Sequence, residues 1–457
     1  MRVEKDFIGE VEIPGNVYYG IHTCRALKNF PKTGEKFNES FIWAIFMIKK
    51  SAALLNYELK YLSKEICDSI ISACDEWVFL KSEIVVDPLS GGAGTSINMN
   101  VNEVIANRAT ELMGGKKSEY IVKPLEHVNL HQSTNDVFPT AGKIAIIKEL
   151  RELIENIIKL QDEIQKKEKE FIKVKKIGRT QLMNAVPILL GQEFGAWADA
   201  LSRDRWRLYK VEERIRSVNI GGTAIGTGIA APKDYVLKIT NKVREITKIG
   251  IAKAENLIDN TQNLDAFSEI SGLLKSLAVN LIKISNDIRL LGSSAINEII
   301  LPKVQAGSSI MPGKVNPIIS EYVIQLSMSV ISFDNLITNG ASLGNLELNH
   351  LTPMIVHYTL KSLIFLKNAT YALKEYIKLI EPNEEKCQEN LIRSFTLITP
   401  LIEIFGYNEV SENLKINDYN LEKTVKYLCQ KNNYDYNEIM RRLNSNKSAG
   451  LGYNIKD

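Results

Sequence analysis

The stretch Leu264–Leu291 reads LDAFSEISGLLKSLAVNLIKISNDIRLL, and its apolar residues recur every three or four positions. That spacing places them on one face of a long α-helix. Between Leu277 and Ile284 only Asn280 and Lys283 are polar, so the helix is apolar on nearly every side there. A helix of this kind is stable when other helices surround it. The stretch therefore predicts a helical bundle.

Four further stretches have the same period and predict the partners of this helix. No alternation of strand and helix patterns is visible, so we do not expect a parallel sheet of the dinucleotide-binding type. We therefore predict a mainly α protein with a long central helical bundle. The four stretches are Gly142–Ile164, Glu193–Val218, Pro317–Leu336 and Thr352–Ile380.

Changes of pattern on either side of the bundle predict three domains. Residues 1–138 form a mixed, mostly helical N-terminal domain, with a short strand at Val11–Ile13 closed by Pro-Gly. Residues 139–382 form the central bundle domain. Residues 383–457, where the helical patterns shorten, form a small C-terminal helical domain. Such long helices do not easily cover all their apolar faces within one chain, so we expect an oligomer.

The composition is that of an ordinary soluble protein, with 45% apolar residues, 24% charged residues and a net charge of +3. Nucleic-acid binders are usually far more basic, so no nucleic-acid partner is expected. The longest uncharged run, Ser217–Pro232, is too short and too rich in glycine to span a bilayer, so no membrane partner is expected. Five cysteines without a Cys-x-x-Cys pair favour a reducing, cytoplasmic location.

Four polar segments interrupt or flank the long helices and are the candidates for chemistry. A site built from their hydroxyls, their amides and one lysine suits a small substrate that bears carboxylates. Two plainer interpretations stay open: Ser133, Thr134 and Asn135 only cap a helix, and the last segment is a surface loop instead of a mobile lid. The segments are Gly91–Asn100 (GGAGTSINMN), His127–Thr140 (HVNLHQSTNDVFPT), Gly178–Glu193 (GRTQLMNAVPILLGQE) and Gly307–Pro317 (GSSIMPGKVNP).

Nucleotide and metal sites find little support in the sequence. GSSIMPGKVNP lacks the glycine spacing and the Lys-Ser/Thr pair of a phosphate loop. The run Gly226–Ala231 fits the loosest dinucleotide pattern, but Pro232 follows it and no strand is expected before it. His127 and His131 stand four apart, as zinc ligands on a helix do, yet the Glu of HExxH and a third ligand are missing. We therefore expect no metal and no cofactor.

Taken together, the four segments resemble the aspartase/fumarase superfamily, from Tyr18 to about residue 370. GSSIMPGKVNP is similar to the signature loop of that superfamily, and MPGKVNP is similar to its fumarase and aspartase branch. The resemblance implies three mainly helical domains in a homotetramer with a twenty-helix core. It also implies active sites that each take residues from three subunits.

Within that branch, three motifs resemble the aspartases. GGAGTS is similar to their first motif, where fumarases read more like SGTQS. Ser133-Thr134-Asn135 resembles the aspartase STN, where fumarases have SSN, and Gly178–Gln181 resembles the GRTQ of some aspartases. The resemblance implies a carbon–nitrogen lyase, an aspartate ammonia-lyase that reversibly eliminates ammonia from L-aspartate to give fumarate. The alternatives are a class II fumarase, a related lyase for another amino acid or succinyl compound, and a non-catalytic oligomeric binding protein.

The resemblance also implies a role for individual residues. Ser308 is the general base that removes a proton from C3 of the substrate, and Lys314 is the cation that meets a carboxylate. His127 and Glu321 match further family positions. The remaining substrate contacts are Thr95, Ser133, Thr134 and Ser309 for the β-carboxylate, Lys314, Asn316 and Thr180 for the α-carboxylate, and Asn135 and Gln181 for the leaving amino group.

The sequence departs from the superfamily pattern at several places. Arg289–Ile299 reads RLLGSSAINEI and lacks the usual Gly-Pro-Arg before the signature loop. His131 stands where relatives have Ser or Cys, Asn184 replaces an Asp, and His350-Leu-Thr352-Pro replaces the more usual VMEP. The inferred substrate contacts are all retained.

Overall fold

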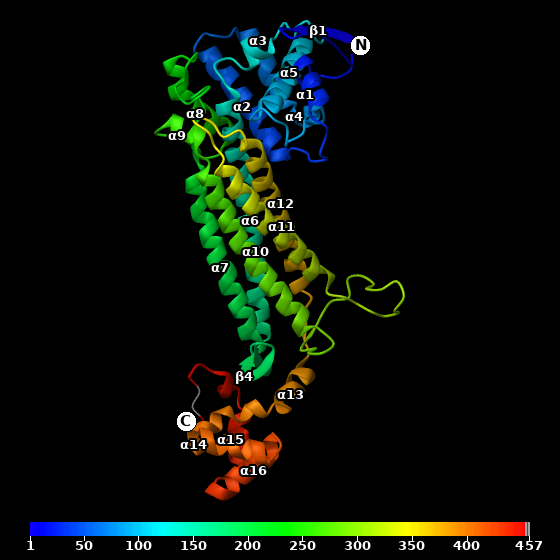
Figure 1. The fold of residues 1–457 in the computed structure, drawn as a ribbon, viewed down its shortest axis with the longest axis vertical. Helices are drawn as coiled ribbons and strands as arrows, with labels where there is room; N and C mark the ends of the chain where they lie inside the picture. Colours follow the sequence, from blue (N-terminus) through cyan, green and yellow to red (C-terminus); the bar gives the residue numbers. More distant parts are fainter. Residues whose placement is uncertain (453–454, 456–457) are drawn as a thin grey trace. The chain divides into compact units, whose positions relative to one another are not determined.

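Five long helices dominate the fold, as the apolar periodicity predicts (Figure 1). They are α6 (Thr134–Glu170), α7 (Leu190–Ile215), α10 (Asp265–Leu291), α11 (Ile318–Ala341) and α12 (Thr352–Ile377). The computed structural model describes residues 1–452 and Ile455. Leu277, Ala278 and Leu281 lie where α10 is apolar on nearly every side, and all three are fully buried. The predicted mainly α fold is therefore confirmed.

The chain divides into two compact units, and each long helix contributes one end to each unit. Unit 1 comprises residues 1–155, 206–278 and 328–367. Unit 2 comprises residues 156–205, 279–327 and those from 368 onward. The predicted division into three domains is a different partition of the chain and stays a prediction.

Unit 1 contains the N-terminal hairpin and the shorter helices that follow it (Figure 1). Strand β2 (Gly9–Ile13) includes the predicted strand and pairs antiparallel with β1 (Arg2–Asp6). β1 reads RVEKD and has a single apolar residue, so apolar periodicity does not predict it. The shorter helices are α1 (Ile21–Asn29), α2 (Glu39–Glu58), α3 (Lys64–Asp75), α4 (Trp77–Leu80), α5 (Thr95–Leu112), α8 (Lys233–Thr247) and α9 (Leu257–Gln262).

One parallel strand pair corrects the expectation that no strand precedes the glycine run at Gly226. β5 (Ser217–Val218) pairs in parallel with β6 (Ala252–Lys253), and α8 lies between them in the chain. A dinucleotide fold needs the helix to begin at the glycines, so that its N-terminus meets the phosphates. Because α8 begins only after Pro232, the glycine run is a structural loop.

Helix α6 continues through Pro139, which lacks the N–H that would bond the carbonyl of Asn135. That carbonyl accepts a hydrogen bond from Nδ2 of Asn219 instead, at 2.9 Å. Asn219 is fully buried and also donates to Oγ1 of Thr261 at 2.9 Å. A side-chain amide thus replaces the missing backbone donor, and α6 begins eight residues before the apolar pattern that predicts it.

Buried ion pairs join the bundle helices within unit 1. Glu149 of α6 is 4% exposed and accepts hydrogen bonds from Lys367 of α12 and from the hydroxyl of Ser40. Lys275 of α10, whose side chain is partly exposed, pairs with the buried Asp334 of α11. These contacts fix the relative rotation of the helices, because a buried charge without its partner is costly.

Unit 2 contains a hairpin between two of the long helices. Strands β3 (Lys175–Thr180) and β4 (Met183–Leu189) pair antiparallel, with an irregularity at Gly178. β7 (Ile299–Ile300) pairs with β8 (Glu381–Pro382) and joins the segment after α10 to the segment after α12. The hairpin carries the predicted site residues Thr180 and Gln181 at its tip.

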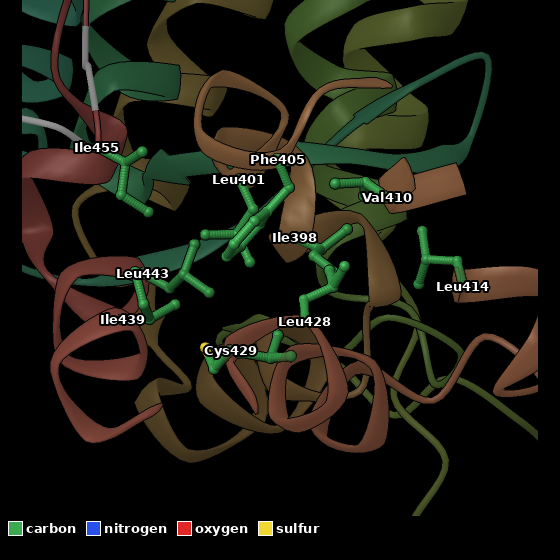
Figure 2. Close-up of a cluster of buried hydrophobic side chains, with 11 residues drawn as sticks. Ile398, Leu401, Phe405, Val410, Leu414, Leu428, Cys429, Ile439, Leu443 and Ile455 are labelled. Carbon is green, nitrogen blue, oxygen red and sulfur yellow. The ribbon is translucent and has the colours of Figure 1, made fainter. Parts of the chain in front are cut away.

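Short helices form the C-terminal part of unit 2. Phe405, Leu428 and Leu443 come from different helices and meet in one apolar cluster, which Figure 2 shows. Lys175 of β3 is buried and its Nζ donates to the carbonyls of Leu443 and Ser445, at 3.0 and 2.8 Å. The helices are α13 (Glu384–Ile392), α14 (Ile402–Phe405), α15 (Tyr407–Ile416), α16 (Leu421–Asn432) and α17 (Tyr436–Asn444).

Two further findings concern the predicted surroundings of the protein. In the part of the chain that the structure describes, no helix combines the length and the apolar composition needed to cross a membrane. All five cysteines are unpaired, and four of them are buried.

Candidate active site

The first polar segment leads into the N-terminus of α5 and presents Thr95 there. Asp87, four residues before the segment, anchors the chain there, because its Oδ2 accepts hydrogen bonds from the N–H and the hydroxyl of Thr33, both at 2.8 Å. Gly94 has a φ of 95°, and a Cβ at this position would lie 2.6 Å from the buried ring of Phe138. Only glycine therefore fits between α6 and the first turn of α5.

Ser133 caps α6, as the plainer interpretation of the STN motif predicts. Its Oγ accepts from the N–H of Asn135 at 3.3 Å, while its own N–H donates to Oδ1 of Asp136 at 3.0 Å. This reciprocal arrangement is a capping box with Asp in the third position. A capping hydroxyl still carries its own proton, so Ser133 keeps a donor for a carboxylate.

The N-termini of α5 and α6 meet through Asn98. Its Nδ2 donates to Oγ1 of Thr134 at 3.1 Å and to Oδ1 of Asn129 at 3.2 Å. Thr95 lies one turn before Asn98 on the same face of α5. The hydroxyls of Thr95 and Thr134 therefore belong to one region, next to two helix N-termini whose dipoles favour an anion.

Asn135 faces the loop that follows β5. Its Nδ2 donates to the carbonyl of Ala224 at 2.7 Å, which fixes the orientation of the amide. Among the described residues no donor reaches Oδ1. That oxygen is therefore available to accept a hydrogen bond from an ammonium group.

Asp136 ties the STN motif to this loop. The carboxylate is fully buried, and its Oδ2 accepts from the N–H groups of Gly221 and Thr223, both at 3.0 Å. Burial raises the pKa of Asp136 to about 6, against the lowering effect of these backbone donors and of Lys49. Lys49 is also fully buried, and burial lowers its pKa to about 7. Asp136 thus fixes the STN motif to this loop, while Nζ of Lys49 donates to the side-chain oxygens of Asn129 and Gln132, at 2.9 and 3.0 Å, in the segment just before the motif.

His127 lies in a short π-helix, η2 (Pro124–Val128). Its Nδ1 accepts a hydrogen bond from the N–H of Lys123 at 3.0 Å, and burial lowers its pKa. The proton of the neutral ring therefore sits on Nε2, which is a donor.

His131 has a structural role. It has a φ of 61°, lies beyond the end of η2, and packs edge-on against Tyr61 and Tyr235. His127 and His131 therefore do not share a face of one α-helix, as a zinc pair would. Nowhere in residues 1–452 or at Ile455 do three or more His, Cys, Asp or Glu side chains gather to hold a metal.

Ser308 lies at the start of the signature loop in unit 2. Its Oγ accepts hydrogen bonds from the backbone N–H groups of Ile310 and Met311, at 3.2 and 2.9 Å. Donors aimed at an oxygen favour its ionised form over its neutral form. The loop thus supplies part of the stabilisation that a serine alkoxide needs.

The loop closes on itself at a narrow neck. The N–H of Gly307 donates to the carbonyl of Lys314 at 2.8 Å, and Nδ2 of Asn316 donates to the carbonyl of Gly307 at 2.7 Å. Asn316 therefore braces the loop in this state, in addition to its predicted substrate contact. Ser309 and Lys314 are exposed, and in the described part of the chain the Lys314 ammonium group makes no ion pair.

A cavity of about 930 Å³ lies beside this neck. Lys314 and Asn316 line it together with Glu321 from the first turn of α11 and with Arg289 from the end of α10. The cavity is large enough for a small dicarboxylate and is lined by three cationic side chains, Arg289, Lys303 and Lys314.

Thr180 and Gln181 are presented at the tip of the β3–β4 hairpin, and both are exposed. The two central residues of the turn, Gln181 and Leu182, have φ values of 53° and 66°. Two-residue turns of this kind normally use Asn-Gly, because a residue with a side chain costs about 1–2 kcal/mol in this conformation. Such strain at an exposed tip is typical of a functional segment.

The predicted residues are divided between the two units of the chain. Set A, on unit 1, contains Thr95, His127, Ser133, Thr134 and Asn135. Set B, on unit 2, contains Thr180, Gln181, Ser308, Ser309, Lys314, Asn316 and Glu321. Asn98 and Asp136 are not among the residues predicted from the sequence, although the Ser-x-x-Asp spacing at Ser133 is a recognisable capping signal.

Comparison with known proteins identifies the family. A family model described as "Lyase" matches residues 9–332, more than half of the chain. The chain belongs to this lyase family. The superfamily resemblance of the four polar segments, all of which lie within the matched residues, is thereby confirmed.

Curated relatives in the lyase family match nearly the full length. The aspartate ammonia-lyase of Bacillus sp is 43% identical over 438 residues, which are 94% of this chain and 93% of the relative. The aspartate ammonia-lyase of Escherichia coli K12 is 42% identical, over 89% of this chain and 87% of the relative. That of Helicobacter pylori strain 26695 is 43% identical, over 93% and 94%.

Solved lyase structures share the fold. The fumarate lyase:delta crystallin from Brucella melitensis bound to cobalt has a TM-score of 0.93 at 40% identity, covering 98% of this chain and 100% of that one. The class II fumarase of Schistosoma mansoni has a TM-score of 0.89 at 31% identity, covering 93% and 95%. Identity is thus lower to this fumarase than to the aspartate ammonia-lyases.

Proposed function

We propose that this protein is an aspartate ammonia-lyase, which reversibly eliminates ammonia from L-aspartate to give fumarate. The name shared by relatives that are 42–43% identical supports this choice. The motifs GGAGTS and STN, which distinguish aspartases from fumarases, support it independently. The observation that carries the mechanism is the pair of N–H groups on the Oγ of Ser308.

Ser308 acts as the general base in this proposal. It removes a proton from C3 of aspartate, next to the β-carboxylate, and the two N–H donors stabilise its alkoxide form. Proton removal places extra negative charge on the β-carboxylate. Fixed donors directed at that charge lower the barrier most when they need no reorganisation.

Set A supplies those donors. The hydroxyls of Thr95, Ser133 and Thr134 bind the β-carboxylate at the N-termini of α5 and α6, and Ser309 adds a fourth hydroxyl. The α-carboxylate is bound by the Lys314 ammonium group through a charge-assisted hydrogen bond, with Thr180 and Asn316. Asn316 exchanges its contact with Gly307 for one with the substrate.

The leaving group is positioned by amides. Oδ1 of Asn135 accepts a hydrogen bond from the substrate ammonium group, and Gln181 contacts it from the hairpin tip. When the C2–N bond breaks, its electron pair leaves with ammonia, while the pair freed at C3 forms the double bond of fumarate. His127 and Glu321 border the site without a role in these steps.

A homotetramer is part of the proposal, because the superfamily resemblance of the four polar segments implies active sites shared between subunits. Three subunits contribute to each active site, and the long helices of the four chains form the twenty-helix core. Exposed apolar side chains on the long helices support such an assembly. In unit 1, Trp206 and Tyr209 of α7 are 56% and 67% exposed, and in unit 2, Val279 of α10 is 52% exposed.

The finer organisation follows the sequence-based expectations. We propose an N-terminal domain at residues 1–138, the bundle at 139–382 and a C-terminal domain at 383–457. A cytoplasmic location agrees with the five unpaired cysteines.

The experiment that tests this function compares two substrates. Purified protein is mixed with L-aspartate or with L-malate, and fumarate is followed by its absorbance. The proposal predicts fumarate and ammonia from aspartate and little fumarate from malate. A kcat/KM for malate equal to or above that for aspartate would identify a fumarase instead.

A further inference from the structure

Glu298 lies outside the predicted site, in the short segment between α10 and β7 where the family's Gly-Pro-Arg is missing. Its backbone is held on both sides. The N–H of Glu298 donates to the carbonyl of Leu291 at 2.8 Å, and its carbonyl accepts from the N–H of Asn383 at 3.0 Å. The side chain is completely buried and therefore has one fixed direction.

The Glu298 carboxylate binds the strand that carries Thr180. Its two oxygens accept from Nη1 and Nη2 of Arg179 at 2.8 and 2.9 Å, a bidentate pair. Oε2 also lies 3.0 Å from Nζ of Lys176, and Oε1 accepts from Nδ2 of Asn390 at 3.0 Å. These four contacts come from two elements, β3 and α13, and leave no oxygen of Glu298 unused.

The charged groups around Glu298 form a cluster of Lys176, Arg179, Glu193 and Glu298, in which positive and negative charges are equal in number. Lys176, which is 1% exposed, also contacts Glu193 at 2.8 Å, so two cations face two carboxylates. Burial alone would raise the pKa of Glu298, but Arg179 and Lys176 outweigh burial and lower it. The carboxylate is therefore ionised, and a neutral residue in its place would leave buried positive charge without compensation.

The hairpin tip needs such an anchor. Arg179 directly precedes Thr180, and the strained turn at Gln181 and Leu182 follows at once. A backbone in a sparsely populated conformation persists when its surroundings over-determine it. The strand register shifts at Gly178, and Arg179 follows it on the side of the hairpin tip. Its ion pair with Glu298 therefore holds the tip beyond the irregularity.

We propose that Glu298 is a positioning residue for catalysis: by clamping Arg179 it sets where Thr180 and Gln181 meet the substrate. The proposal rests on the substrate contacts proposed above for these two residues. Glu298 touches no substrate itself and acts through the hairpin.

A double-mutant cycle separates positioning from mere structural support. The variants are Glu298→Gln, Thr180→Ala with Gln181→Ala, and all three changes together, each assayed for kcat/KM with L-aspartate. Misplacement of a substrate contact by about 1 Å costs about 100-fold, which is the loss expected for Glu298→Gln alone. In the background without the Thr180 and Gln181 side chains, the same change should cost less than about 10-fold, because little remains to be misplaced.

Glu149→Gln is the matched control. It makes the same carboxylate-to-amide change in a buried ion pair, but Glu149 contacts Lys367 and Ser40 and no site loop. It should lower the unfolding temperature and leave kcat/KM unchanged. Arg179→Lys is a second test, because it keeps the charge of the cluster but loses the bidentate geometry. Its loss of kcat/KM should likewise be smaller when the Thr180 and Gln181 side chains are absent.

Hydrogen exchange gives a readout that needs no substrate. The amides of residues 180–183 should exchange faster in Glu298→Gln than in the wild type, and not in Glu149→Gln. A wild-type kcat/KM in Glu298→Gln or Arg179→Lys would overturn the positioning role. So would a Glu298→Gln loss that is equally large with and without the Thr180 and Gln181 side chains. A wild-type protein that forms no fumarate from aspartate would instead contradict the proposed function, while the exchange result would still report on the clamp.

Discussion

Replacing Gly94 by alanine should lower kcat/KM for aspartate by about 100-fold, because Thr95 would no longer sit at its present place. The new Cβ would lie 2.6 Å from Cδ2 of Phe138. That ring is fully buried and packs 4.8 Å from the ring of Phe41, so it has little room to yield. Such overpacking costs about 1–3 kcal/mol. The left-handed backbone adds about 1–2 kcal/mol, which gives a total of about 2–5 kcal/mol.

Gly114→Ala separates the two contributions. Gly114 has a φ of 85°, close to the 95° of Gly94, but a Cβ at Gly114 would have no neighbouring atom within 4 Å. It should lose only the backbone contribution of about 1–2 kcal/mol and keep its kcat/KM. The assay is fumarate absorbance, with denaturant unfolding for the stabilities. Wild-type kcat/KM in Gly94→Ala, or an equal loss in Gly114→Ala, would refute the packing argument.

Three further changes test the site. Ser308→Ala should lose about 10²–10⁴-fold in kcat with the assembly intact, and a variant that keeps more than about a tenth would exclude Ser308 as the base. Lys314→Ala should weaken substrate binding and slow turnover, and an unchanged kcat/KM would make the signature loop a plain surface loop. Asp136, whose pKa burial raises to about 6, should gain a proton below that pH and hold Gly221 and Thr223 less well. Activity should then fall while the protein stays folded. The pKa of Asp136 is higher in the folded than in the unfolded protein, so its protonation favours the folded state. Asp136→Asn should lack this pH dependence of activity.

The helical bundle could be predicted because the signal is local. The predicted range Thr352–Ile380 and the observed α12 share their first residue and differ by three at the end. The start of α6 could not be found from apolar period, because its first turns are determined by Ser133, Asp136 and the distant Asn219. The period of apolar residues shows which face of a helix packs against its neighbours. It carries no information on the polar side chains that cap the end of the helix.

The site could be predicted as a set of residues but not as an arrangement. The motif residues stand in recognisable runs, whereas the clamp between Arg179 and Glu298 joins positions 119 residues apart. The turn at Gln181 and Leu182 also lacks the Asn-Gly signal that usually marks a two-residue hairpin. Both features depend on tertiary contacts that override local preference.

The most direct test of one catalytic centre built from sets A and B is complementation between inactive subunits. Ser308→Ala and Asn135→Ala each spoil every site of their own tetramer. The two variants are unfolded together in equal amounts and reassembled, and native mass spectrometry confirms mixed tetramers. If Ser308 and Asn135 reach a site from different subunits, about one quarter of the sites regain both intact residues under random mixing, and activity returns in proportion. Mixed tetramers with no activity above that of the parents would contradict a site shared between subunits.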